Sequence, residues 1–198
     1  MFLFNRCKHD DCQLYAADEE EYCLQHVDDP ESCAARLITK IKSNNYLQDL
    51  NASSMIVEDE DFSNRIFKVC NFSESSFRNV DFSKSNIELS FFHYSYFEHC
   101  NFLGVDIKYA VFAGSTFKNC NFSESDIVHT NFLGVKAWDC SFDDSDLYYS
   151  NFTNADLHQV SFVDCNLKKT DFVGSTREEV SFKYSNYEEA HFQQDTPI

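Results

Sequence analysis

The chain has 198 residues, which is long enough to bury a sizeable core. Its 4 glycines, 2 prolines and single tryptophan stand against 21 phenylalanines and 10 tyrosines, an unusual composition for a globular domain. With 33 acidic and 16 basic residues the net charge is −17. This charge excludes nucleic acid and anionic membranes as direct partners, because both attract basic surfaces, and it leaves open a partner protein with a basic face.

The nine cysteines indicate a reducing compartment. The apolar run that starts at Met1 is too short for a secretion signal, and no stretch approaches the length that spans a membrane. Without a secretion signal, cysteines are expected to be metal ligands or small core residues rather than disulfides. We therefore expect a cytoplasmic protein that makes no membrane contact.

Residues 1–29 carry two pairs of metal-ligating side chains. Cys7 and Cys12 form the first pair, and Cys23 and His26 form the second within Tyr-Cys-Leu-Gln-His. This spacing suits a tetrahedral zinc site in which a turn supplies one pair and the start of a helix the other. A segment this small and acidic needs such a staple to be ordered. Four protein ligands leave no open position, so we expect structural zinc and no catalytic role.

Two alternatives remain open for this segment. Cys33 or His9 would replace one of the four ligands, or the cysteines would be unpaired in a flexible acidic tail. The segment also resembles the short zinc-knuckle-like modules at the start of various bacterial proteins, in which Cys-x4-Cys precedes Tyr-Cys-x2-His. This resemblance implies a zinc ion bound by the same four side chains.

Residues 30–61 are expected to form a helix and an irregular capping coil. Pro30 at the first helical turn, with acidic residues near it and lysines toward the end, matches the polarity that a helix dipole favours. One apolar stripe follows helical spacing: Ala34, Leu37, Ile38 and Ile41. Leu50 and Met55 are five residues apart but out of step with the repeat that follows, which indicates an irregular first coil or cap.

From Phe62 to Phe192 one position recurs every five residues without an insertion and is almost always large and apolar. This frame has 27 positions and holds 18 of the 21 phenylalanines, where random placement would give about 3. Two residues before each central position the side chain is small, and the next residue is mostly Asp or Asn. A five-residue period fits neither a helix nor an alternating strand. It fits a chain that turns a corner every five residues, with large and small side chains pointing inward.

The repeated residues resemble the pentapeptide-repeat family, whose unit is a small residue, Asp or Asn, Leu or Phe, a polar residue and any residue. Examples are Asp81-Phe82-Ser83, Asn121-Phe122-Ser123 and Ala155-Asp156-Leu157. The resemblance implies an all-β solenoid for residues 62–198, a right-handed quadrilateral β-helix with four units per coil. Steps of twenty give two central columns of Phe alone and one of mostly Ile and Leu, which supports four sides and about seven coils.

The repeat contains two kinds of exception. Cys100, Cys120 and Cys140 share one small inward column, and we interpret them as fillers rather than as a redox or metal ladder. Arg177 takes a central position, where burial of its charge would be costly, so we expect that side to be open or distorted.

No helix follows Phe192 to close the C-terminal end, which favours a homodimer through that end.

Some outward positions carry apolar or aromatic residues. Phe91, Tyr94, Tyr96 and Val111 lie near one corner, where we expect the apolar stripe of the helix to dock, with a partner site as the alternative. Tyr109, His129 and Tyr149 share an outward column flanked by three aspartates, which is either a solvated ladder or a recognition strip.

These features predict a non-enzymatic protein-interaction scaffold of unknown partner. The inward side chains leave no pocket, and the outward histidines lack a nucleophile partner. The family resemblance also implies an alternative, because some members are acidic rods that resemble B-form DNA and bind DNA gyrase. Against this alternative, residues 62–198 carry 19 acidic and 11 basic residues, whereas residues 1–61 carry 14 acidic and 5 basic residues. The net charge is therefore −9 outside the rod and −8 within it, so more than half of the net negative charge lies outside the rod.

Overall fold

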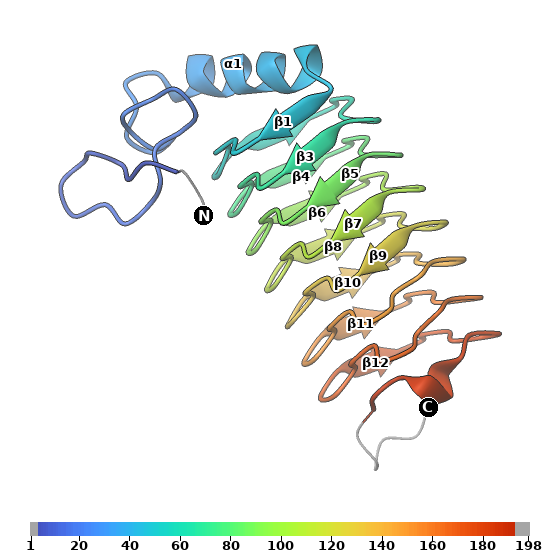
Figure 1. Ribbon diagram of the computed structural model, residues 1–198. Helices are drawn as coiled ribbons and strands as arrows, with labels where there is room; N and C mark the ends of the chain where they lie inside the picture. The colour runs from blue at the N-terminus through green and yellow to red at the C-terminus, as the bar shows by residue number, and fades with distance from the viewer. Residues whose placement is uncertain (1–3, 193–198) are drawn as a thin grey trace.

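The computed structural model describes residues 4–192, which form a small N-terminal module, one helix and a tower of short parallel strands (Figure 1). In the module, residues 4–29, an antiparallel bridge joins Arg6 to Tyr15. Helix α1 spans Pro30–Ser43, as the sequence predicts, and the N-cap Asp29 accepts a hydrogen bond from the Ser32 amide at 3.0 Å. The helix lies across the N-terminal end of the tower, close to the module (Figure 1).

Within the described residues, three-residue strands form two all-parallel sheets, which make two opposite sides of the tower. The first sheet has the order β1 (Tyr46–Gln48), β3 (Ile66–Lys68), β5 (Asn86–Glu88), β7 (Asp106–Lys108), β9 (Asp126–Val128). The second begins with β2 (Ile56–Glu58), β4 (Ser76–Arg78), β6 (Tyr96–Glu98) and β8 (Thr116–Lys118). It continues with β10 (Lys136–Trp138), β11 (Asp156–His158) and β12 (Thr176–Glu178), and a short 3-10 helix follows at Tyr187–Glu189.

Neighbouring strands pair at a step of twenty residues. Tyr46 pairs with Ile66 in the first sheet, and isolated bridges such as Asn101 to Asn121 continue the same step on the remaining sides. The fold is therefore a four-sided, all-parallel β-solenoid of about 7 turns, which confirms the predicted fold class. None of the helices within residues 4–192 has the length and apolar character needed to cross a membrane.

Stacked phenylalanine rings fill the interior. The rings of Phe82, Phe102 and Phe122 are fully buried, with centroid distances of 4.8 Å and 4.4 Å between successive rings. Rings from adjacent sides meet edge-on, as between Phe117 and Phe122 at 5.4 Å. Each ring of this kind stabilises the fold by about 1.5–3 kcal/mol through burial. The central column of phenylalanines thus becomes a continuous core along the tower.

Each side of the tower ends at a residue in the left-handed conformation, such as Tyr149 with φ of 62°. Ser150 follows Tyr149 in a small inward position. Its hydroxyl accepts a hydrogen bond at 3.1 Å from the inward-pointing amide of Thr130, which lies one coil, or twenty residues, earlier. The same hydroxyl donates to the Ile127 carbonyl at 2.8 Å. The inward serine and threonine hydroxyls are therefore hydrogen-bonding groups as well as fillers, because a buried backbone amide needs an acceptor.

The predicted irregular coil is wrong for residues 46–61. Leu47 lies beside Phe67 in the parallel register, so the five-residue frame already begins in the first coil. Leu50 and Met55 are buried in the small inward positions, where later units carry Ser, Cys or Val. The pattern was obscured because large side chains occupy small positions here while an alanine takes a central one. The division of the chain into three domains remains a prediction.

The apolar stripe of α1 docks on the end of the tower and not on the corner predicted from the outward aromatic residues. Leu37 and Ile41 join the buried cluster that contains Leu47 and the first central residues. Phe91 instead lines a groove together with Tyr15 of the N-terminal module. The helix covers the edge of the first coil, where the interior would otherwise meet solvent. At the other end, residues 193–198 lie outside the described residues.

Candidate functional site

Two turns of the N-terminal module present the predicted metal ligands. The first turn closes when the Cys12 amide donates to the His9 carbonyl at 3.2 Å. The second places His26 one turn after Cys23, since the His26 amide donates to the Cys23 carbonyl at 2.8 Å. A hydrogen bond from the Lys8 amide to the Glu21 carbonyl holds the two turns side by side.

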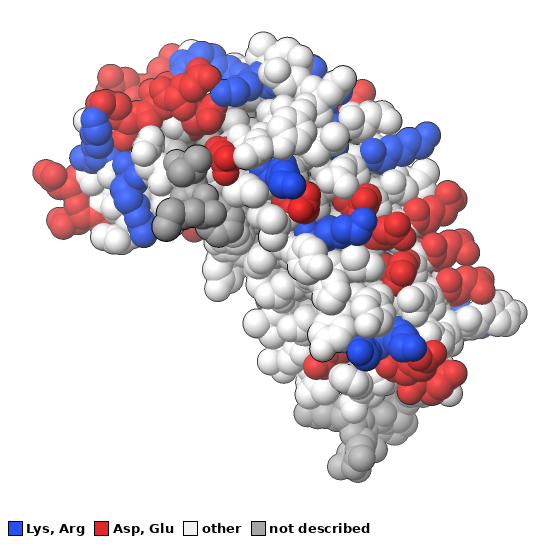
Figure 2. Space-filling view, in the orientation of Figure 1, with Lys and Arg blue, Asp and Glu red and all other residues white. Residues whose placement is uncertain are grey.

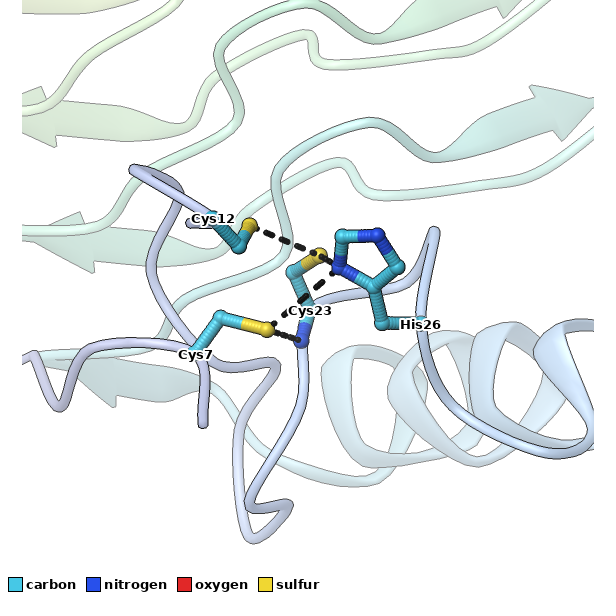
Figure 3. Close-up of side chains that lie close together, drawn as sticks. All are labelled: Cys7, Cys12, Cys23 and His26. Carbon is cyan, nitrogen blue, oxygen red and sulfur yellow. Dashed lines mark hydrogen bonds between the residues drawn. The ribbon is translucent and has the colours of Figure 1, made fainter. Parts of the chain in front are cut away.

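The structure brings all four predicted ligands together. The Sγ atoms of Cys7, Cys12 and Cys23 and a ring nitrogen of His26 lie within 4.8 Å of one another (Figure 3). The His26 Nδ1 is 3.5 Å from the Cys7 Sγ and 3.3 Å from the Cys23 Sγ, and the Sγ atoms of Cys12 and Cys23 are 3.9 Å apart. A tetrahedral zinc with Zn–S bonds of about 2.3 Å requires edges of about 3.5–3.8 Å. Three of the donor–donor distances are therefore close to the edges of a tetrahedral zinc site, and the group could hold a metal ion.

Local electrostatics favour one thiolate in this group. Burial opposes ionisation of Cys7, but hydrogen bonds from the Cys23 amide and from neighbouring groups lower the pKa of Cys7 to about 6. Burial and the adjacent thiols raise the pKa of Cys23 to about 11. A cation at the centre of the group would stabilise all the thiolates, because metal ions bind the deprotonated form.

The substitute ligands considered from the sequence lie outside the group. The ring of His9 stacks on that of His26, with centroids 3.8 Å apart and planes 6° from parallel. Cys33 is buried in α1, and burial raises the pKa of its thiol. His9 thus orients the His26 ring, and Cys33 belongs to the core between helix and tower.

Polar contacts fasten the module to the rest of the chain. Lys40 of α1 forms ion pairs with Asp18 and Glu19. The Asp18 amide donates to the carbonyl of Asn51 at 2.9 Å, and the Asn51 side chain donates to the Ala16 carbonyl at 2.5 Å. The module is therefore built into the N-terminal cap of the solenoid.

The outward column predicted from the sequence forms a ring stack, which we call the ring column. It consists of Tyr109, His129 and Tyr149, with centroid distances of 5.2 Å and 5.1 Å. All three side chains are exposed. On the same side of the tower, the outward aspartates form a second column, the carboxylate column: Asp106, Asp126 and Asp146.

A second outward cluster escaped sequence reasoning. On the second sheet, the ring of Trp138 stacks on His158 at 5.8 Å, and the Lys118 ammonium lies 5.8 Å from the Trp138 ring. His158 also contacts two carboxylates, Asp156 at 2.9 Å and Glu178 at 3.0 Å. The sequence did contain a signal for this cluster: its members are twenty residues apart, so they share one column of the tower. They are Lys118, Trp138 and His158.

Comparison with known proteins gives one family match. Residues 114–192 match the family model described as "Pentapeptide repeat region". Among curated protein sequences, none matches the chain.

Several solved structures are similar to the chain. QnrB1, a plasmid-mediated fluoroquinolone resistance protein, has 13% identity and a TM-score of 0.39 over 75% of this chain and 91% of that chain. A pentapeptide repeat protein from the thylakoid lumen of Arabidopsis thaliana has 33% identity and a TM-score of 0.30, over 44% of this chain and 64% of that one. Rfr23 from the cyanobacterium Cyanothece 51142 has 12% identity and a TM-score of 0.24, over 80% and 99%. The matched family model supports a pentapeptide-repeat region at residues 114–192, and the same five-residue frame runs through the coils that precede it.

Proposed function

We propose that the protein is a non-enzymatic interaction scaffold, a rigid rod that presents columns of side chains to a partner protein. The observation that carries the proposal is the ring column, in which Tyr109, His129 and Tyr149 remain exposed yet stacked on successive coils. The interior beneath them is filled with apolar side chains. A surface fixed in this way loses little conformational entropy on binding, which favours recognition by a preformed face.

The N-terminal module is proposed to hold a structural zinc ion. Cys7, Cys12, Cys23 and His26 would bind it, and the three sulfurs and one imidazole nitrogen are the donors that zinc favours. The bound ion would supply no chemistry beyond tying the two turns together. Its role in the scaffold is to keep the cap on the first coil ordered, since the module has a small core of its own.

The scaffold function is tested by capture of partners from an extract of the source organism. The folded chain is immobilised, and the bound proteins are compared with those on a variant in which the ring column is replaced by asparagine. Asparagine tolerates the left-handed backbone at these positions, so the variant keeps the fold. Proteins that bind the natural chain and not the variant support the proposal, and identical sets from both would contradict it.

Mimicry of DNA is the second candidate, because acidic residues line one corner of the tower in two adjacent columns. These residues are Glu124, Asp126, Asp144, Asp146 and Asp164. Lysines and arginines lie among the acidic side chains elsewhere on the visible face (Figure 2). A gyrase supercoiling assay decides between the candidates: the scaffold proposal expects neither inhibition nor protection at micromolar protein, and either effect would favour mimicry.

A further inference from the structure

The side of the tower that carries the first sheet contains an incomplete charge pattern. In the coil of β7, the Lys108 ammonium pairs with Asp106 of the same strand at 2.8 Å. Lys108 lies two residues after Asp106, so both side chains point outward on one strand. This pair shows how a basic side chain can neutralise a member of the carboxylate column by forming an ion pair with it.

The next two coils keep the carboxylates but lack the lysine. Val128 and Tyr148 occupy the positions equivalent to Lys108, beside Asp126 and Asp146. Within residues 4–192, no basic side chain forms an ion pair with either of these aspartates. The pattern changes again one coil later, where Lys168 returns and Asn166 replaces the aspartate.

Apolar and aromatic groups border these two carboxylates, and the Lys169 ammonium lies 5.8 Å from the centre of the Tyr148 ring. Val128 and Tyr148 are half-buried, and the Tyr148 ring meets the His129 ring edge-on at 5.8 Å. The ring column runs along the far edge of the same side. About three residues of extended backbone, roughly 10 Å, separate the ring column from the carboxylate column. The aliphatic stem of a lysine or arginine covers much of such a distance while its charged end remains hydrated or paired.

We propose that Asp126, Val128, Asp146 and Tyr148 form a docking site for a basic segment of a partner protein. Its lysine or arginine stems would lie on Val128 and Tyr148, and their charged ends would pair with the two aspartates in the way that Lys108 pairs with Asp106. Charge complementarity selects this occupant, because the adjacent corner carries further carboxylates at Glu124 and Asp144. The inference rests on the proposed scaffold function and specifies the chemistry of its partner.

The test restores the missing lysine within the chain itself. In Val128→Lys, the new ammonium is placed to pair with Asp126 and thereby to occupy the site. Fluorescence anisotropy then measures binding of a labelled peptide of alternating arginine and alanine. We expect the affinity to fall by about fivefold or more, since one paired charge and its apolar contact are lost.

Two controls separate this site from general attraction to an acidic protein. Val173→Lys makes the same change of charge on another side of the tower and should leave the affinity within about twofold. The pair Asp126→Asn and Asp146→Asn should weaken binding, whereas Asp59→Asn and Asp139→Asn, on the opposite side, should not. Equal losses in the site and control variants, or no peptide binding, would overturn the inference.

A single-stranded oligonucleotide serves as the competing probe, because exposed rings also stack with bases. Oligonucleotide binding that depends on Tyr149 would overturn the basic-segment inference. Failure of this inference is distinguishable from failure of the scaffold proposal. Partners that are captured from the extract through the ring column, but remain bound to Val128→Lys, would leave the scaffold standing without this docking site.

Discussion

The side-chain amide of Asn71 donates a hydrogen bond to the Asn51 Oδ1 at 2.7 Å, and Asn51 in turn donates to the Ala16 carbonyl of the N-terminal module. Asn51 is only 3% exposed. An asparagine ladder between the first two coils therefore continues into the cap. It explains how a module with few apolar residues of its own is held against the tower.

Replacement of Asn51 by alanine is expected to lower the free energy of unfolding by about 2 kcal/mol, because it leaves buried carbonyl and amide groups without partners. Urea unfolding measures the loss, and limited proteolysis should show faster cleavage within residues 4–29. The control is Asn131→Ala in the same column, where the side chain accepts only from the Leu133 amide near the surface. Equal effects of the two variants would contradict a role of Asn51 in attaching the module.

Metal removal should release the module without unfolding the tower. We expect about one zinc per chain, and a strong chelator should expose three thiols, those of Cys7, Cys12 and Cys23, to a thiol reagent. The remaining six cysteines should stay unreactive because they are buried. Trp138, the single tryptophan, reports on β10, so its fluorescence should not change.

Two variants test which side chains bind the zinc ion. Cys23→Ser should lose most of the zinc, because the remaining three ligands bind less tightly. His9→Ala should retain it, since His9 only stacks on the His26 ring. A zinc content below about 0.3 per chain in the natural protein would reject the site, as would nine unreactive thiols after chelation.

The repeat was readable from the sequence because its period is strict and the central residues from Phe62 to Phe172 are all buried for the same reason. The cluster of Cys7, Cys12, Cys23 and His26 was also predictable, since the two pairs have spacings set by local turns. The first coil was not, because Leu50 and Met55 reverse the usual order of large and small side chains. The role of the inward hydroxyls was missed as well, because the amide that each one accepts from lies twenty residues away in sequence.

The buried thiol of Cys70 predicts a loss of stability at alkaline pH. Burial raises the pKa of Cys70 to about 12, from 9.0 for an unperturbed thiol. The folded state therefore keeps the proton while the unfolded state loses it. The protonated Cys70 thiol makes its full contribution to the free energy of unfolding below pH 9. This contribution is lost between pH 9 and pH 12, where the free energy of unfolding falls by about 1.4 kcal/mol per pH unit.

The variant Cys70→Ala should reduce this alkaline slope when urea unfolding is repeated between pH 8 and pH 10.5. Tyrosines and lysines also titrate in this range, but they contribute equally to both proteins. The control Ser115→Ala removes a hydroxyl from an equivalent inward position and should lower stability without changing its pH dependence. An unchanged slope in Cys70→Ala would mean that the thiol ionises in the folded protein.

Arg177 is the one charged residue in the central frame, and its replacement by leucine is expected to stabilise the protein. The residue pairs in register with Leu157 on β11, and its Nη1 atom is buried without a hydrogen-bond partner among the described residues. Burial lowers the pKa of the guanidinium. Its ring contact with Phe192, at 4.8 Å, offsets only part of this cost.

Arg177→Leu should therefore raise the free energy of unfolding by about 1 kcal/mol, measured as a higher urea midpoint at an unchanged slope. The control Arg78→Leu removes an outward arginine that pairs with Glu58 and Glu98 at the surface, and it should leave the urea midpoint unchanged or slightly lower. A loss of stability in Arg177→Leu would mean that the guanidinium has a partner outside residues 4–192. Sedimentation of both proteins would then show whether that partner is a second copy docked at the C-terminal end, because only the natural chain would form the dimer.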